Sequence, residues 1–236
     1  MSGPDTDQDY RAAFARIEQA VDAGETDLGT LGFWRLLAKV KAEPALAEHW
    51  AEIAGRIDRA AFEARVRPRF PVWFGNALLL LGTLAGSFAV GLALGTDSEG
   101  LAGLALLFAA GAWLVCLHDL AHWLTGRIVG IRFTSYFLGG PFPPRPGLKS
   151  DYATYLRTAP AARAWMHASG AIATKAAPLA ALAVWPATVA PAWAAWAIAG
   201  VGAFTVATDI AFSTKRSDWK KVRRELRVAR LQASGR

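Results

Sequence analysis

Two histidines and an aspartate lie within five consecutive residues, His118-Asp119-Leu120-Ala121-His122. On an α-helix, residues four apart lie on one face, one turn apart, so both imidazoles can bind a single metal ion. Asp119 lies beside that face, where its carboxylate can accept a proton from a water molecule on the metal. The spacing therefore predicts metal-assisted hydrolysis, with His118 and His122 as ligands and Asp119 as the general base.

The segment that carries this motif has the composition of a membrane-spanning helix. Leu101–Leu124 contains no charge before His118, and ionisable groups inside a span are costly and usually functional. The alternative is that the two histidines only contact lipid headgroups or backbone carbonyls. Two other charges, Lys175 and Asp209, lie inside predicted spans at comparable depths when residues are counted at about 1.5 Å each. We therefore expect these groups to belong to one site.

Four segments are long and apolar enough to cross a bilayer, whose hydrocarbon core of about 30 Å requires about 20 helical residues. They are Val72–Leu94, Leu101–Leu124, Ala164–Trp185 and Ala192–Phe212. Of the 236 residues, 53% are hydrophobic and only 19% are charged, against about 25% charged in soluble domains. Composition therefore predicts an all-α, polytopic helical bundle in the cell (cytoplasmic) membrane, in contact with the lipid bilayer.

A soluble N-terminal segment precedes the first span. Residues 1–68 hold 12 acidic and 9 basic side chains, whereas the rest of the chain holds 7 and 17. Apolar residues at intervals of three and four predict three amphipathic helices there, Asp9–Ala23, Thr30–Ala42 and Pro44–Val66. We expect a soluble helical segment over 1–69, a transmembrane core over 70–214 and a basic tail helix over 215–236.

The loop between the second and third spans, Thr125–Arg163, is rich in glycine and proline. Its Gly130–Gly140 stretch has the pattern of a strand and turn. The basic residues lie before span one, in this loop and after span four, and the other two loops have none: Arg65, Arg67, Arg69; Arg127, Arg132, Arg145, Lys149, Arg157, Arg163; Lys215, Arg216, Lys220, Lys221, Arg223, Arg224. By the positive-inside rule, both termini and the long loop are expected in the cytoplasm.

Other classes of function have weaker support. The pI near 9.9 comes mainly from basic residues that flank apolar spans, and no nucleic-acid, Walker or dinucleotide motif is present, so no nucleic-acid partner is expected. Cys116 is the single cysteine and has no intrachain disulfide partner. His49 is expected to be an ordinary histidine without a chemical role.

The chain resembles, over about residues 101–225, the site-2 protease family of intramembrane zinc metalloproteases. His118 and His122 match the family's His-Glu-x-x-His, with Asp119 in the place of the glutamate. The family's Gly-Pro-x-x-Asn stretch corresponds to Gly170-Ala171-Ile172-Ala173-Thr174, with alanine and threonine in the places of proline and asparagine. The family's Asn-x-x-Pro and Asp-Gly correspond to Asp209-Ile210-Ala211-Phe212 and Ser217-Asp218-Trp219, with spacing one residue longer.

The resemblance implies that zinc is bound by His118, His122 and a third ligand, for which family position favours Asp218. Asp209 and His167 remain alternatives, and Asp209 can instead pair with Lys175. Asp218 can also be a simple acidic residue in the first turn of the tail helix, after a Ser217 cap. Aspartate is one methylene shorter than glutamate, so we expect the Asp119 carboxylate to stop about 1 Å short of the position that the family's base occupies.

Three functions follow as hypotheses. The first is a zinc metalloprotease that hydrolyses a peptide bond in a membrane-embedded or membrane-associated protein substrate, with Lys175 as a group that can polarise the scissile carbonyl. The second is a catalytically inactive relative that acts as a binding or regulatory module. The third is a haem-binding or transport bundle, in which His118 or His122 pairs with His167.

Overall fold

The computed structural model describes residues 6–139, 145–211 and 217–234. The structure is 79% helical, with ten α-helices and a small sheet in its described parts, which confirms the expected helical bundle in outline. Three predicted features lie outside the described residues: the end of the fourth span at Phe212, the end of the Gly130–Gly140 stretch, and the start of the tail at Lys215.

The chain divides into two compact units. The head unit comprises residues 1–72, 127–163 and 225–236, and the bundle unit comprises residues 73–126 and 164–224. The long loop between the second and third predicted spans therefore belongs to the same compact unit as the N-terminal segment. The sequence had grouped that loop with the transmembrane core.

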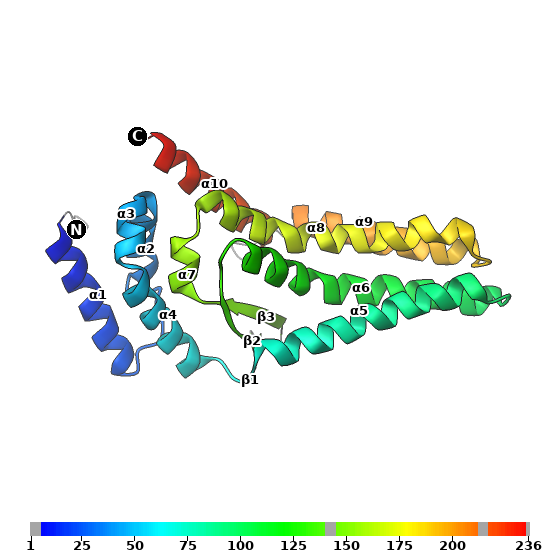
Figure 1. The fold of residues 1–236 in the computed structure, drawn as a ribbon, viewed down its shortest axis with the longest axis horizontal. Coiled ribbons are helices and arrows are strands. Elements are labelled where there is room, and N and C mark those ends of the chain that lie inside the picture. Colours follow the sequence, from blue (N-terminus) through cyan, green and yellow to red (C-terminus); the bar gives the residue numbers. More distant parts are fainter. Residues whose placement is uncertain (1–5, 140–144, 212–216, 235–236) are drawn as a thin grey trace. The chain divides into compact units, whose positions relative to one another are not determined.

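The head unit contains five complete helices (Figure 1): α1 (Asp7–Asp22), α2 (Phe33–Ala42), α3 (Pro44–His49), α4 (Ala51–Arg65) and α7 (Tyr152–Arg157). The third predicted helix is interrupted at Trp50, which ends α3 and precedes α4. The Trp50 ring is buried and stacks on Phe14 of α1, with ring centroids 5.2 Å apart. This tertiary contact accompanies a break that the periodic pattern did not predict.

Helices α4 and α7 approach each other closely because Gly55 has no side chain. A Cβ at Gly55 would lie 2.8 Å from the Cβ of Ala153. Two ion pairs flank this contact, Arg59 with Asp151 at 2.6 Å and Lys149 with the buried Asp58. Ala153 also joins the apolar core formed by the first four helices.

A three-stranded antiparallel sheet completes the head unit, in the order β1 (Arg69–Phe70), β2 (Phe133–Gly139) and β3 (Arg145–Ser150). Phe70 pairs with Tyr136, and Tyr136 pairs with Leu148. Strand β2 lies where the sequence predicted strand and turn. Its partner β1 is only two residues long, too short for a periodic signal.

Buried charges connect the end of the chain to the head unit. Glu225 is fully buried, and it accepts hydrogen bonds from Lys41 at 3.1 Å, from Arg163 at 2.7 Å and from the Tyr155 hydroxyl at 2.9 Å. Burial by itself would raise the pKa of Glu225, but the positive charges of Lys41 and Arg163 outweigh it and lower the pKa from 4.5 to about 2. A single carboxylate thus compensates two cations in the core.

Because of this network, the stability of the head unit is expected to fall at acid pH. Because the unfolded chain takes up a proton at Glu225 more readily than the folded one, the stabilisation is complete above pH 4.5 and is lost as pH falls towards 2. We expect hydrogen exchange in α2 and α7, corrected for intrinsic rates, to accelerate over that range. Glu225→Gln should flatten this pH dependence, whereas the exposed Glu63→Gln should not. An equally steep profile in both variants would contradict the assignment.

The bundle unit is built from α5 (Val72–Gly95), α6 (Glu99–Ile128), α8 (Pro160–Val184), α9 (Ala192–Ala211) and the first two turns of α10 (Asp218–Ser234). The ribbons of α5, α6, α8 and α9 run side by side (Figure 1), and all four contribute to one apolar cluster. Among the described residues, three stretches are long and apolar enough to cross a membrane: α5, α6, and Pro160–Ala187, which is α8 extended by a short 3₁₀ turn.

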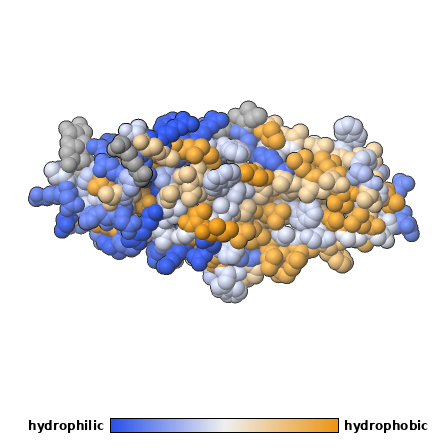
Figure 2. Space-filling model, turned by 45° about the horizontal axis from the view of Figure 1, so that its top comes forward, coloured by the Kyte–Doolittle hydropathy of each residue, from blue (hydrophilic) through white to orange (hydrophobic). Residues whose placement is uncertain are grey.

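Most of the buried residues of this cluster are alanines, whereas many large apolar residues of the same helices are exposed. Ala93, Ala102, Ala109 and Ala181 are fully buried, which allows the helix backbones to approach closely. Large apolar side chains face outwards, and hydrophobic residues gather on the surface of these helices (orange in Figure 2): Leu80, Leu81, Leu84, Phe88, Leu104, Phe108, Trp196 and Phe204 are exposed. An apolar exterior around an alanine-rich interior is the pattern of a bundle that lies in lipid.

Candidate metal centre

Three side chains of the bundle unit come together although they are up to 100 residues apart in sequence. His118 and His122 lie one turn apart on α6, with ring centroids 4.7 Å apart. Asp218 is the first residue of α10, and its Oδ2 lies 3.5 Å from His118 Nε2 and 3.3 Å from His122 Nε2. The three ligand atoms lie within 4.8 Å of one another, so the group could hold a metal ion.

A hydrogen bond to a backbone carbonyl determines where His122 carries its proton. Its Nδ1 lies 2.6 Å from the carbonyl oxygen of Met166 on α8. A carbonyl can only accept, so Nδ1 is the protonated nitrogen. In the neutral ring, the lone pair is then on Nε2, the atom that faces Asp218.

His118 is oriented in the same sense by Thr174, also on α8. The Thr174 hydroxyl donates to the carbonyl oxygen of Gly170 at 3.0 Å, so it accepts from His118 Nδ1 at 2.8 Å. The lone pair of neutral His118 is therefore on Nε2 as well. Outer contacts of this kind, to a carbonyl and a hydroxyl, fix the tautomer and the orientation of metal-binding histidines.

The donor set fits a divalent cation. Two Nε2 lone pairs and a carboxylate oxygen face one another, and neutral rings place no proton between them. Protonating both rings would place two positive charges on rings whose centroids are only 4.7 Å apart, which is unfavourable. One cation would satisfy all three groups, and two histidines with one carboxylate are a common ligand set for zinc.

Asp218 is held as a carboxylate. Its Oδ1 accepts a hydrogen bond from Lys221 at 2.8 Å, one turn further along α10. Burial alone would raise the pKa of Asp218, but the positive charge of Lys221 and the hydrogen bond that it donates act in the opposite direction, and the pKa lies well below its usual range. The oxygen that faces the two imidazoles is therefore negatively charged at neutral pH.

Asp209, one of the alternative third ligands, lies in a different cluster. Its Oδ2 accepts hydrogen bonds from Lys175 on α8 and from Trp219 Nε1 at 3.0 Å. Trp219 directly follows Asp218, so its hydrogen bond to this half-buried ion pair anchors the first turn of α10. The pairing of Lys175 with Asp209 occupies the lysine that the sequence suggested could polarise a carbonyl.

His167 does not belong to the group formed by His118, His122 and Asp218. Its ring lies 6.4 Å, centroid to centroid, from the ring of His122. Both nitrogens of His118 and of His122 have contacts elsewhere, with Thr174, Met166 or Asp218. This arrangement gives no support to a haem held between His167 and either of them.

Asp119 is half-buried on α6 and, among the described residues, has no hydrogen-bond or ion-pair partner. An unpaired carboxylate next in sequence to His118 is free to accept a proton, which a carboxylate held in an ion pair is not.

Gly170 has a part in the site that the sequence did not reveal. A Cβ at Gly170 would lie 2.2 Å from His122 Nε2, so only glycine leaves room for this ring. Gly170 and Thr174 are four apart on α8, and they serve His122 and His118, which are four apart on α6. The signal in the sequence was this matched spacing. A pair of histidines four apart on one helix can face a glycine and a threonine four apart on another.

The chain matches no protein-family model, no curated protein and no solved structure.

Proposed function

We propose that this protein is an intramembrane zinc metalloprotease that hydrolyses a peptide bond in a membrane-embedded or membrane-associated protein. The observation that supports this best is the group His118, His122 and Asp218, with both Nε2 lone pairs directed at one carboxylate oxygen. The two histidines of the group lie on α6, a helix apolar enough to span a membrane. The resemblance of the motifs to the site-2 protease family points the same way.

The roles of the residues follow from their positions. His118, His122 and Asp218 would hold zinc and leave a fourth position open. Zinc bound there would supply Lewis acidity and lower the pKa of a bound water. Asp119 accepts a proton from the water molecule that attacks the peptide carbonyl. It then gives this proton to the leaving amine, so the carboxylate is regenerated at the end of the cycle. Thr174 and the Met166 carbonyl keep the two imidazoles in the ligating tautomer.

Zinc binding is the first prediction of this proposal. We expect one zinc per chain in the purified protein and none in the His118→Ala, His122→Ala double variant. Thr174→Val keeps the shape of the side chain but loses the hydroxyl, so it should weaken zinc binding by about 10- to 100-fold. Elemental analysis and competition with a chelator measure both effects. Full zinc content in the double variant would rule out the site.

Topology is the second prediction. We propose that α9, whose 20 residues reach about 30 Å at 1.5 Å per residue, is a fourth span, and that both termini lie in the cytoplasm. Reporter fusions at Ser98 and Thr188 should then score as external, and fusions at Ser150 and the C-terminus as internal. An external score at Ser150 would contradict both the orientation and the cytoplasmic side of the site.

A non-catalytic role is the second candidate, because Asp119 stands where the family has glutamate. Such a protein would keep the zinc and bind membrane partners without cleaving them. The two candidate functions differ in whether Asp119 transfers a proton, and variants of that residue distinguish them.

A further inference from the structure

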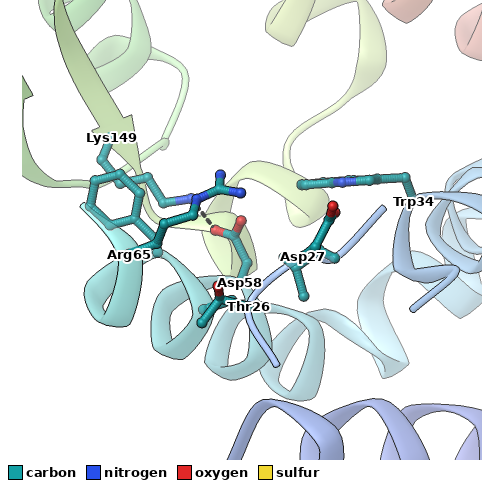
Figure 3. A pocket seen from close by; sticks show the side chains of 9 residues that line it. Thr26, Asp27, Trp34, Asp58, Arg65 and Lys149 are labelled. Atoms are coloured by element: carbon teal, nitrogen blue, oxygen red, sulfur yellow. Dashed lines mark hydrogen bonds and ion pairs between the residues drawn. The ribbon is translucent and has the colours of Figure 1, made fainter. Parts of the chain in front are cut away.

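A pocket in the head unit lies within residues that the proposed zinc chemistry does not use. Its cavity of about 190 Å³ is bordered by Thr26, Asp27, Trp34, Asp58, Arg65 and Lys149. In Figure 3, Arg65 and Lys149 lie towards one side of the pocket, and Trp34 and Asp27 lie towards the other. All of these residues belong to the head unit, so the pocket is complete within it.

Two of the four charges around the pocket neutralise each other. Asp58 is only 4% exposed and forms an ion pair with Lys149, whose Nζ also lies 4.9 Å from the centre of the Phe62 ring. Burial raises the pKa of Asp58 even though Lys149 lies beside it. A buried charge at the wall of a pocket is costly and is more frequent at functional sites than elsewhere.

The other two charges, Arg65 and Asp27, are available to a ligand. Among the described residues, Arg65 has no hydrogen-bond or ion-pair partner, and its side chain is exposed. Asp27 uses Oδ1 to accept from the backbone of Gly29 at 2.8 Å, and no described donor contacts Oδ2. In Figure 3 its carboxylate points towards the ring of Trp34, which is 47% exposed.

A free carboxylate that points towards an indole ring in the same pocket is suited to an ammonium group, which is attracted by the carboxylate charge and by the π-system. The free guanidinium of Arg65 is suited to a carboxylate or phosphate, which it can bind with two parallel hydrogen bonds. A ligand that satisfies both ends carries one positive and one negative charge. Either charge alone would leave the opposite end of the pocket uncompensated.

We propose that the head unit binds a small zwitterion in this pocket, with its cationic group on Trp34 and Asp27 and its anionic group on Arg65. The volume agrees with this class of ligand. At about 30 Å³ per water molecule, the cavity holds about six waters, which corresponds to a free amino acid, a betaine or the phosphocholine part of a lipid. The ligand chemistry is the same whether the source is a soluble molecule or a lipid headgroup.

Calorimetric titration of the full-length protein in a choline-free detergent tests this proposal with three zwitterions: glycine betaine, L-alanine and phosphocholine. We expect at least one to bind with a Kd below about 1 mM. Acetate and tetramethylammonium carry only one of the two charges, and each should bind at least about tenfold more weakly than the best zwitterion. A preference for phosphocholine would identify a lipid as the source, and a preference for betaine or alanine a soluble molecule.

Variants assign the binding to this pocket. Asp27→Asn keeps the side-chain oxygen that accepts from Gly29 but removes the charge, and Trp34→Leu and Arg65→Gln remove the other two contacts. Each should weaken the binding of the best zwitterion by about tenfold or more, whereas Arg35→Gln, at an exposed position, should leave its binding unchanged. The proposal is overturned if none of the three zwitterions binds below about 1 mM. It is equally overturned if tetramethylammonium binds as tightly as the best zwitterion. It is also overturned if all three variants bind the best zwitterion as tightly as the wild type does.

Discussion

Replacement of Asp119 by asparagine is expected to lower the rate of cleavage by about 100- to 10,000-fold, the usual cost of losing a positioned general base. Asparagine has the size and polarity of aspartate but cannot accept the proton. Asp119 is not one of the three grouped ligands, so zinc content should not change. An effect on rate without an effect on zinc distinguishes a proton-transfer group from a ligand.

The substrate for this measurement can be found with the protein itself. A membrane protein whose fragment appears with the wild type but not with His118→Ala is a substrate candidate, and its cleavage can then be followed in proteoliposomes. Asp97→Asn, an exposed change in the loop between α5 and α6, is the matched control and should cleave normally. Equal cleavage by the wild type and Asp119→Asn would remove Asp119 as the base.

Asp119→Glu separates a working enzyme from an inactive relative. In a site adapted to aspartate, the additional methylene displaces the carboxylate by about 1 Å, and a displacement of that size can lower the rate about 100-fold. In a relative that has lost activity, glutamate restores the family motif and should restore cleavage. If the wild type cleaves no protein and Asp119→Glu does, the result would support the binding or regulatory role.

Gly170→Ala is expected to disrupt the zinc site without changing any ligand. The new methyl group would lie 2.2 Å from His122 Nε2, so the ring must move. That ring is held by the Met166 carbonyl at 2.6 Å, and its Nε2 lies 3.3 Å from Asp218 Oδ2, so a displaced ring loses the arrangement of the three grouped atoms. Because loss of an outer contact alone costs about 10- to 100-fold in metal affinity, we expect a decrease of at least about 100-fold, measured by competition with a chelator.

Gly111→Ala is the matched control for this change. Gly111 also lies in a membrane-type helix, and a Cβ there would have no atom within 4 Å. It should bind zinc as the wild type does, and both variants should keep the helical content of the wild type by circular dichroism. If Gly170→Ala keeps its zinc affinity, His122 does not occupy the position described.

Local patterns in the sequence were sufficient for most helices. The apolar positions expected on the first helix, Tyr10, Phe14, Ile17 and Val21, are all buried. Three of the four predicted spans coincide with helices long and apolar enough to cross a membrane. Helical periodicity and the length of apolar segments depend on neighbouring residues, so they can be recognised without a tertiary structure. The pairing of His118 and His122 is of the same local kind.

The partners of those histidines could not be derived in this way. Sequence left Asp218, Asp209 and His167 as alternatives, and the tertiary structure groups only Asp218 with the pair, because Lys175 and Trp219 engage Asp209. Which residues of α8 and α10 meet α6 depends on how each helix is rotated and how closely it packs. Rotation and close packing arise from contacts between residues distant in sequence, such as His122 over Gly170, and no local pattern records them.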